Sequence, residues 1–409
     1  SASPTRPYLV RLDSTGAVDS TFFTSGGPNA QVNTVALQRD SGGAVAAILI
    51  GGNFGAVAGT SRAAGLARLG TGGALDPTVP FNPSAQRTGV VYSLAPLPSG
   101  RMLVAGDFTT IDGVARTHLA RFEANGSLDN GFAPSLNGSV NSLLAQADGR
   151  IALVGSFTSV NGQTLNRIAR LNGDGTTDFA FNPGSGVSAA LNLIVPQSDG
   201  KLLVGGGTTT FTYNGTSRTG LVRINSDGSL DPAFNPGTFN STVDAAVVQP
   251  DGKIVVAGNF TSLSGVLQGR IARLNKTDGS LDPTFSVGGG YLSGFTVTNG
   301  GADYISAPTV TISAPQLAGG TTAMATATIS GGAVTALTLT NPGLGYTTAP
   351  TITLSGGGAT TAATATATVA SFGFTSQVYS LALSPDDGTI LAGGGFTTFV
   401  SGATTTTRN

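Results

Sequence analysis

The chain has 409 residues with no Cys, no Trp and a single His, and only 10% of its residues are charged. Its 20 basic and 21 acidic residues leave a net charge of −1, which offers no electrostatic attraction to nucleic acid or to an anionic membrane. The lack of Cys excludes disulfides, thiol nucleophiles and thiolate metal sites. Hydrophobic residues still make up 40% of the chain, so we expect a packed β-type protein rather than a disordered one.

The chain holds no candidate membrane helix. Its longest apolar stretch, residues 43–51, is far shorter than the roughly 20 residues that a bilayer-spanning helix needs. The sequence begins at Ser1 without Met or a charged, apolar leader. We therefore expect a mature form after signal removal or an excised segment, and both fit a secreted or cell-surface protein.

The first recurring element opens the chain as LVRLDSTGAVD, and its pattern [LI]-x-R-[LIF]-x(3,4)-G-x-x-D occurs six times. Successive arginines are 57, 53, 49, 53 and 50 residues apart, which is a blade-sized period. Within each copy, Gly and Asn or Asp separate two short segments that we expect to form a hairpin. The arginines are Arg11, Arg68, Arg121, Arg170, Arg223 and Arg273.

A second element alternates with the first, and it also occurs six times. An apolar residue stands eight residues before a turn, and an apolar run ending in Gly-Gly or Gly-x-Phe follows. Asp-Gly at 148–149, 199–200 and 251–252 lies between apolar runs of period two, which indicates β-hairpins. The leading apolar residues are Val32, Val91, Val140, Leu191, Val243 and Val378.

Together, the two elements predict the fold. Four short strands in every ~50 residues, without helical periodicity, are typical of a β-propeller. Six copies predict six blades. Copy four departs from the pattern with VGGGTTTFTYNG, which we expect to form a locally longer loop.

Val378 stands 93 positions after Phe285, where the preceding copy has an offset of nine, so residues 288–371 are expected to be an insert in a loop of the last blade. The insert is duplicated: TVTNGGADYISAPTVTIS matches TLTNPGLGYTTAPTITLS, with Tyr304 and Tyr346 42 residues apart. Thr alternating with Ala, Val or Ile predicts half-buried strands. We expect a small all-β domain of two pseudo-symmetric halves.

The two ends of the chain carry complementary parts of one repeat. The C-terminal TTTTRN places Arg408 where other copies have Arg62 and Arg218, and residues 6–12 would supply the missing continuation. Because an unpaired edge strand is a liability, we expect an N-terminal hairpin to close the ring. The predicted division is therefore 1–287 and 372–409 for the propeller, with 288–371 as the inserted β module.

The pattern R-L-x-x-x-G-x-L-D-x-x-F, followed by V-x-x-L-x-x-Q-x-D-G-K-[IL]-x-[VL]-x-G-x-F, resembles the delta-60 repeats of large bacterial secreted and surface proteins. The resemblance covers about residues 1–285 and 372–409. It implies propeller-like repeats and brings no catalytic residues. The GY-x-x-A-P-T segments of the insert look like repeats of bacterial and viral surface fibres.

The Arg and the Asp of the first element are eight residues apart in five copies and nine in the sixth, so a hairpin can place them on one face as cross-strand partners. They could form a ring of ligand-binding charges or one internal ion pair per blade. Sixfold repetition favours structural ion pairs. The pairs are Arg11–Asp19, Arg68–Asp76, Arg121–Asp129, Arg170–Asp178, Arg223–Asp231 and Arg273–Asp282.

Calcium is the only cofactor that the sequence suggests, and the suggestion is weak. Two copies carry oxygen ligands at a spacing that partly matches an acidic calcium loop. The alternative is a glycine turn in which Asn and Asp bond their own backbone, which the absence of a terminal Glu favours. The candidates are Asn172, Asp174 and Asp178 in one copy and Asn225, Asp227 and Asp231 in the next.

Other candidate sites are few. His118 is the only His and has no G-x-S-x-G near it, so we expect a surface or strand-end residue rather than a triad member. Tyr304 and Tyr346 are candidates for contact with a partner or a glycan, with turn-anchored core tyrosines as the alternative. No catalytic residue is assigned.

These observations favour a non-catalytic extracellular structural or adhesive module, with a cell-surface fibre as one setting. Its partners would be other surface proteins or copies of itself, and a glycan is a further candidate. The alternative is a secreted propeller enzyme, a lyase or hydrolase acting on glycans, with Asp residues around a central channel.

Overall fold

The computed structural model describes residues 8–13, 18–23, 26–61, 65–76, 89–285, 290–317, 320–371, 373–384, 388–401 and 404–407. Throughout this part of the chain the regular elements are β-strands, so the all-β prediction is confirmed. None of the described residues belongs to a helix with the length and hydropathy to cross a bilayer. Two compact units divide the chain: Ser1–Val204 with Phe211–Ser217 and Arg223–Leu230, and Gly205–Thr210 with Arg218–Val222 and Asp231–Asn409.

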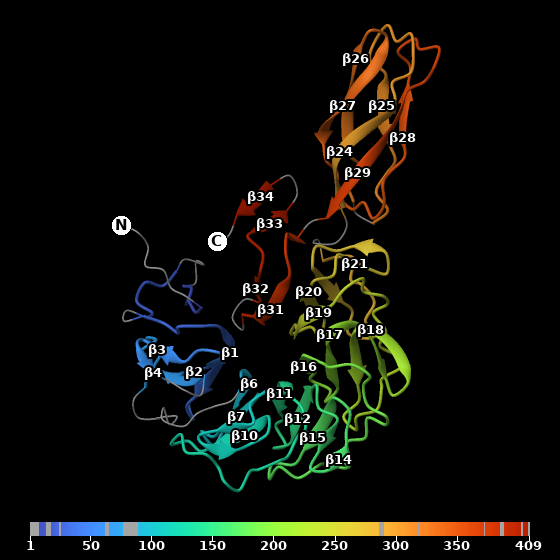
Figure 1. Cartoon of the computed structure of the whole chain (residues 1–409). Helices are drawn as coiled ribbons and strands as arrows, with labels where there is room; N and C mark the ends of the chain where they lie inside the picture. Colours follow the sequence, from blue (N-terminus) through green and yellow to red (C-terminus); the bar gives the residue numbers. More distant parts are fainter. Residues whose placement is uncertain are drawn as a thin grey trace. The chain divides into compact units, whose positions relative to one another are not determined.

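In the first unit, each repeat forms a three-stranded antiparallel sheet (Figure 1). The middle strand pairs with the strand that starts at the leading apolar residue on one side and with the strand that carries the motif Arg on the other. The three sheets are β1 (Val32–Arg39), β2 (Val45–Gly52) and β5 (Leu66–Leu69); β6 (Val91–Pro96), β7 (Met102–Gly106) and β10 (Leu119–Phe122); and β11 (Val140–Ala145), β12 (Ile151–Gly155) and β15 (Ile168–Leu171).

A two-stranded hairpin connects the middle and the Arg-bearing strand of each of these sheets. Its two-residue turn has positive φ at both positions, for example 51° at Asn161 and 78° at Gly162, as a type I′ turn requires. The hairpins are β3 (Ala56–Val57) with β4 (Thr60–Ser61), β8 (Thr110–Ile111) with β9 (Val114–Ala115), and β13 (Ser159–Val160) with β14 (Gln163–Thr164).

The later repeats follow the same plan. The fourth sheet contains β16 (Leu193–Pro196), β17 (Leu202–Tyr213) and β18 (Thr216–Ile224). The fifth contains β19 (Val243–Val248), β20 (Ile254–Gly258) and β23 (Ile271–Leu274), with the hairpin β21 (Ser262–Leu263) and β22 (Val266–Leu267). In the last repeat, β31 (Val378–Leu383) pairs with β32 (Ile390–Gly394), and β30 (Gly373–Phe374), β33 (Thr398–Ser401) and β34 (Thr404–Thr407) form a separate sheet.

Two details differ from the sequence-based expectation. The predicted fourth strand of each blade is reduced to a single bridge, such as that between Leu171 and Thr177, because the glycine turn leaves no room for a longer ladder. In copy four the expected longer loop is wrong. The TTTFTY segment instead extends β17 to 12 residues, since alternating Thr, Phe and Tyr suit a strand.

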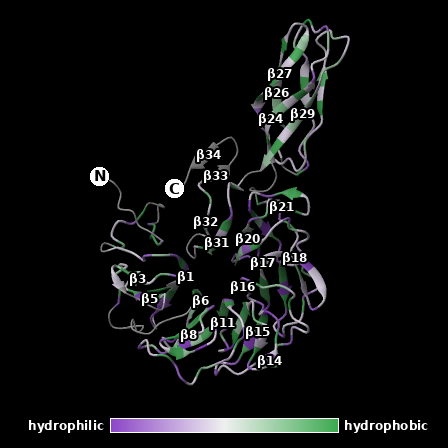
Figure 2. Cartoon of the chain, viewed as in Figure 1, coloured by the Kyte–Doolittle hydropathy of each residue, from purple (hydrophilic) through white to green (hydrophobic). Residues whose placement is uncertain are grey.

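The core lies between successive sheets. Leu49 of the first sheet packs with Val104 of the second, and Leu103 of the second packs with Leu153 of the third. The middle strands β7 and β12 are fully buried, and in Figure 2 apolar residues accordingly concentrate in the strands of the repeats. Each repeat therefore covers one face of the next, as stacked repeats do.

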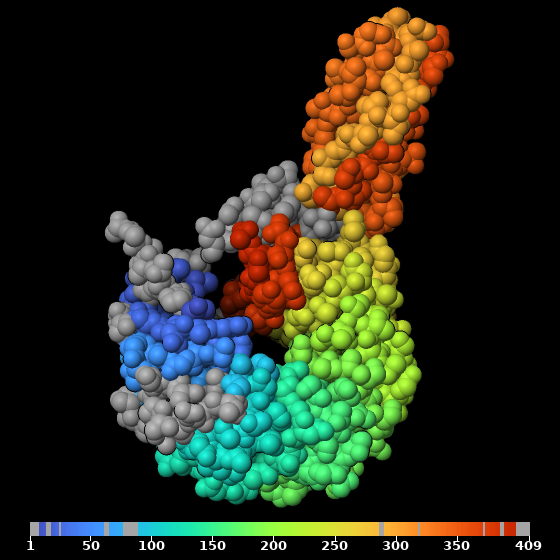
Figure 3. All heavy atoms as spheres, viewed as in Figure 1, coloured from blue at the N-terminus to red at the C-terminus, as the bar shows by residue number. Residues whose placement is uncertain are grey.

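The inserted segment has its own strands and its own core. Its strands begin at Gly290 and end at Ser371, close to the predicted limits of 288 and 371. Figure 3 shows its atoms, in orange, as one packed body. The strands are β24 (Gly290–Asn299), β25 (Thr309–Ile312), β26 (Met324–Ser330), β27 (Ala333–Asn341), β28 (Ile352–Ser355) and β29 (Thr364–Ser371).

The two halves of the insert exchange strands. The first strand of the first half, β24, pairs with the last strand of the second half, β29, and β26 pairs with β27 in the reciprocal way. The two middle strands, β25 and β28, pair with each other. Neither half therefore contains the hydrogen-bonding partners of its own strands, and the β26–β27 hairpin joins the two halves.

The proposed closure by the N-terminal hairpin depends on Arg6 and Arg408, which lie outside the described residues. Within the described segment at the start of the chain, Leu12 and Val18 form a bridge, and the Asp19 N–H donates to the Arg11 carbonyl at 2.9 Å. The first copy of the Arg–Asp element is thus a hairpin like the later ones.

Candidate functional site

The structure brings the Arg and the Asp of the first element into contact. A guanidinium nitrogen lies 2.6 to 2.8 Å from a carboxylate oxygen in five copies, and each Asp N–H donates to the carbonyl of its Arg at 2.8 to 2.9 Å. These pairs are Arg11–Asp19, Arg68–Asp76, Arg121–Asp129, Arg170–Asp178 and Arg273–Asp282. In the fourth sheet, Arg223 and Asp231 are both buried, with 5% and 4% of their surface exposed.

Four of these pairs are tied to an aromatic ring; in the other, the residue three positions after Asp76 is Val79. The motif continues D-x-x-F, and the Arg guanidinium lies over the ring of that Phe, 4.4 Å from the centroid for Arg121 and Phe132. The same contact joins Arg11 to Phe22, Arg170 to Phe181 and Arg273 to Phe285, at 4.8 to 4.9 Å. Arg therefore contributes both an ion pair and a cation–π contact, which Lys would not reproduce with the same geometry.

Three of these arginines also reach the following repeat. Arg170 donates to the carbonyl of Ser226 at 2.6 Å, and Arg121 and Arg11 donate in the same way to Gly173 and Thr71. The Phe rings pack on the glycine of that next turn. At Gly175, with φ of 92°, an added Cβ would lie 3.2 Å from Phe132, so this position combines a left-handed backbone with tight packing. The Arg–Asp–Phe unit thus links consecutive repeats.

Electrostatics keep these carboxylates ionised. Burial alone would raise the pKa of Asp282, but hydrogen bonds from Lys253, Thr284 and Arg273 outweigh it and hold the pKa below its ordinary value. The pKa of Asp178 is lowered in the same way, with Arg170 as the main partner opposing burial. A carboxyl group with a depressed pKa is a poor proton donor near neutral pH, which suits a structural role better than acid catalysis.

The calcium candidates do not converge on a metal site. Asp174 accepts hydrogen bonds from the N–H and hydroxyl of Thr176 at 2.9 and 2.6 Å, and Asp227 is bonded in the same way by Ser229. Asn172 and Asn225 donate to those same hydroxyls. Asp178 is ion-paired, and Asp231 accepts the Ala233 N–H. Across the described residues, no group of three or more His, Asp or Glu could hold a metal.

The two insert tyrosines are not contact residues. Tyr304 and Tyr346 have only 5% and 0% of their surface exposed, so the prediction that they contact a partner is wrong. The Tyr346 hydroxyl accepts the Ala323 N–H at 2.9 Å and donates to the Ser313 carbonyl. The Tyr304 hydroxyl accepts the Ala363 N–H at 2.9 Å. Each tyrosine therefore bonds the opposite half of the insert.

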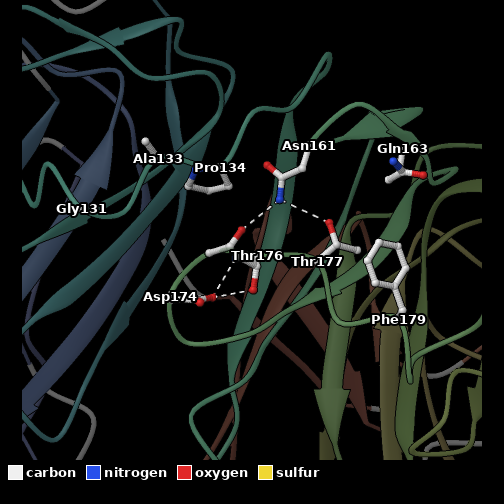
Figure 4. Close-up of a pocket in the computed structure, with 10 residues that line it drawn as sticks. Gly131, Ala133, Pro134, Asn161, Gln163, Asp174, Thr176, Thr177 and Phe179 are labelled. Atoms are coloured by element: carbon white, nitrogen blue, oxygen red, sulfur yellow. Dashed lines mark hydrogen bonds between the residues drawn. The ribbon is translucent and has the colours of Figure 1, made fainter.

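A shallow hollow of about 400 Å³ lies beside one calcium candidate (Figure 4). Its polar groups are bonded to one another: Asn161 donates to the Gly175 carbonyl and to the Thr177 hydroxyl, and Thr176 holds Asp174. Phe179, at its rim, is 73% exposed. The hollow contains no pair of titratable groups that could act as acid and base.

His118 stands directly before β10, at the strand end that the sequence predicts. Its backbone has φ of 68°, and its N–H donates to the Phe108 carbonyl at 2.8 Å. Burial lowers the pKa of the imidazole, although the Gly106 backbone and Asp107 oppose that shift. The residue therefore stays neutral at physiological pH, at a backbone position that the other repeats share.

One recurrent feature was not predicted from the sequence. It is a β-bulge near the start of the strand that begins with the leading apolar residue, called the innermost strand below. In five repeats the residue after the leading Val is skipped in the register, for example between Val140 and Ser142 opposite Gly155 and Val154. A bulge turns the extra side chain away from the ladder. The bulged residues are Asn33, Tyr92, Asn141, Asp244 and Tyr379.

The glycine of the Gly-x-Phe element marks this bulge. A Cβ on Gly155 would lie 2.0 Å from the Ser139 carbonyl oxygen, and the corresponding glycines are equally close to the carbonyl before their leading Val. Only glycine lets the backbone approach this closely. The recurrence of Gly two residues before Phe was the available sequence signal.

Stacked antiparallel sheets linked by a repeated Arg–Asp–Phe unit define a β-propeller-type repeat protein. Residues 1–22, 48–78, 97–132, 146–181, 197–234 and 249–285 match a family described as "Domain of unknown function (DUF5122) beta-propeller". Six segments between residues 1 and 285 therefore match DUF5122 β-propeller repeats, and the predicted propeller fold is confirmed.

Solved structures of low sequence identity also match parts of the chain. The chain is similar to the WD40 β-propeller domain of Doa1 (12% identity, 63% of this chain and 82% of that chain, TM-score 0.34). It is also similar to a streptogramin B lyase structure (14%, 66% and 73%, 0.33) and to YCF48 bound to D1 peptide (12%, 83% and 94%, 0.34). No curated protein matches the sequence. Identities this low transfer no ligand and no reaction.

Proposed function

We propose that this chain is a non-catalytic structural or adhesive module of an extracellular surface, in which the repeats form a scaffold and the insert makes the main contact. The resemblance of the repeats to delta-60 repeats and of the insert to surface-fibre segments supports a bacterial cell-surface fibre as the setting. The partner is another copy of the chain or a neighbouring surface protein.

The main support for the proposal is that the charged residues of the repeats serve the scaffold. The periodic arginines and aspartates form ion pairs inside each repeat and bond the turn of the next repeat, so they serve the scaffold. Their carboxyl pKa values are lowered, which keeps them ionised and paired. A chain with only 10% charged residues has few others with which to perform acid–base chemistry.

The insert offers a surface suited to contact between like molecules. Asp303 is the single charged residue in its sequence, so two copies would meet little electrostatic repulsion. Each of its three strand pairs presents an exposed cross-strand pair of threonines, whose hydroxyls can donate and accept hydrogen bonds. These pairs are Thr296–Thr366, Thr311–Thr353 and Thr326–Thr338.

The test compares three proteins in a sizing and filament-formation assay: the whole chain, the chain without residues 288–371, and Thr326→Lys/Thr338→Lys. We expect assembly, or adhesion to producing cells, to be lost in the deletion and reduced at least tenfold in the lysine variant. Ser198→Lys, at an exposed turn of the repeats, is the matched control and should assemble normally. Equal assembly by all of them would reject the contact role of the insert.

A glycan lyase or hydrolase activity is the outcome that would overturn the non-catalytic proposal. Purified whole chain should release no reducing sugar and no unsaturated product from neutral or acidic polysaccharides. Turnover abolished by substitution of a single Asp would assign the chain to the enzyme class instead.

A further inference from the structure

The bulged residues of consecutive repeats line a second hollow. Asn33, Tyr92, Asn141 and Asn192 surround it together with Ser139, and its volume is about 400 Å³. All five belong to the first unit, in which the innermost strands β1, β6, β11 and β16 lie next to one another in order. Asn192 occupies the equivalent position in the fourth repeat, directly before β16.

The scaffold around this position is constant while the bulged side chain varies. The leading apolar residue and the facing glycine recur because the bulge needs them, as the 2.0 to 2.2 Å approaches at Gly52, Gly106 and Gly155 show. The residue at this position is Asn, Tyr, Asn, Asn, Asp and Tyr in the six successive copies. Packing alone would favour the same residue in each repeat, whereas a ligand without repeat symmetry requires different groups at equivalent places.

The lining residues hold one another in place. Asn141 donates to the Leu191 carbonyl at 3.1 Å and to the Asn192 side-chain oxygen at 2.8 Å, and it accepts a hydrogen bond from the Ser139 hydroxyl. The Tyr92 hydroxyl donates to Asp107 at 3.1 Å. Burial and the nearby Asp107 raise the pKa of Tyr92, so the phenol stays protonated. The site is therefore ordered before any ligand arrives.

Two polar side-chain atoms of the lining residues remain available to a ligand. Asn33 uses its amide nitrogen on the Val91 carbonyl, and Asn192 uses its side-chain oxygen on Asn141. Among the described residues, the Asn33 Oδ1 and the Asn192 Nδ2 make no hydrogen bond. Asn33 therefore offers a free acceptor and Asn192 a free donor. The half-buried Tyr92 ring adds an apolar surface. No carboxylate, Lys or Arg lines the hollow.

From this arrangement we propose that the hollow formed by Asn33, Tyr92, Ser139, Asn141 and Asn192 binds a neutral saccharide. Hydroxyl groups that both donate and accept match the free acceptor of Asn33 and donor of Asn192, and the CH face of a sugar ring packs on an aromatic ring such as Tyr92. An extended peptide is less suitable, since the lining offers one ring and no further apolar pocket for side chains. The site is separate from the insert and does not depend on the proposed contact role.

The experiment uses the whole chain and titration calorimetry with cello-, xylo-, manno- and chito-oligosaccharides of four to six units. Oligogalacturonate and a flexible Gly-Ser peptide serve as comparison ligands. We expect at least one neutral oligosaccharide to bind and its affinity to fall at least tenfold in Asn192→Ala and in Tyr92→Ala. Gln163→Ala, an exposed amide at the rim of the other hollow, is the matched control and should bind as the parent chain does.

Folding of the variants is checked by their circular dichroism and melting temperature, because the Asn192 side-chain oxygen also holds Asn141. Asn192 is the decisive position because its amide nitrogen makes no hydrogen bond among the described residues. If no neutral oligosaccharide binds at millimolar concentration, the proposal is wrong. Binding of only the peptide or only the galacturonate would also reject it. Binding that Asn192→Ala and Tyr92→Ala leave unchanged would place the saccharide elsewhere and overturn the assignment.

Discussion

The repeats and the insert are both products of duplication, but they use it in opposite ways. The first five repeats form three-stranded sheets of their own, and Arg11, Arg121 and Arg170 each bond the next repeat, as Arg170 does with Ser226. In the insert the halves exchange strands, and Tyr304 and Tyr346 each bond the other half. Sequential copies can accumulate one at a time, whereas exchanged halves are stable only together.

The largest effect should come from removing half of the insert. Deleting residues 333–371 leaves β24 and β25 without their partner strands and exposes residues such as Leu292, which is fully buried. We expect the remaining half to lose protection from hydrogen exchange and to cause aggregation. Deleting residues 288–371 as a whole should leave the repeats folded, with an unchanged β signature by circular dichroism. The reverse order of damage would show that the insert is integral to the repeats.

A smaller loss is expected when one ion pair of the repeats is broken. Arg170→Leu leaves the buried Asp178 carboxylate with the Ala180 N–H and with Arg150, at 3.3 Å, so the repeats should lose roughly 3 kcal/mol of stability. The double variant Arg170→Leu/Asp178→Leu removes both charges and should lose less than half as much, measured by denaturant unfolding. Equal losses in the two variants would argue that the ion pair itself contributes little.

The tyrosines of the insert provide a graded comparison within one module. Tyr346→Phe removes two hydrogen bonds and should cost about 2 kcal/mol, while Tyr304→Phe removes one and should cost about 1 kcal/mol. Tyr379→Phe, at a ring that is 59% exposed, is the control and should change nothing. Local hydrogen exchange at Ala323 and Ala363 would report the loss directly.

The smallest contrast is in the response to acid. The pKa values of Asp129, Asp178 and Asp282 are lowered in the folded state, so the stability that they contribute is complete above about pH 4 and is lost as the pH falls through the folded pKa. We expect hydrogen exchange in the repeats to rise between pH 4 and pH 2. The insert, with Asp303 as its single carboxylate, should keep its protection over that range. Parallel losses in both regions would contradict the structural role of the pairs.

Much of this organisation could be predicted from the sequence, because the spacing of Arg and Asp is local and a hairpin converts it directly into a contact. Strand exchange in the insert could not be predicted, since alternation gives the faces of a strand but not its partner. The burial of Tyr304 and Tyr346 could not be predicted for the same reason, because their hydroxyls bond residues 59 and 23 positions away. A single extra residue, as in the bulge at Asn141, is hidden within an otherwise regular alternation.

One short segment, residues 269–273, contacts the chain on both sides of the insert. Phe285 lies against Arg273, and Phe374 donates its N–H to the Gly269 carbonyl while its own carbonyl accepts from Arg270 at 2.7 Å. With both ends fixed, the length between them has little influence on stability, since each doubling of a loop costs only about 0.6 kcal/mol. We therefore expect that a module of another length or sequence can be joined at these two points without changes to the repeats.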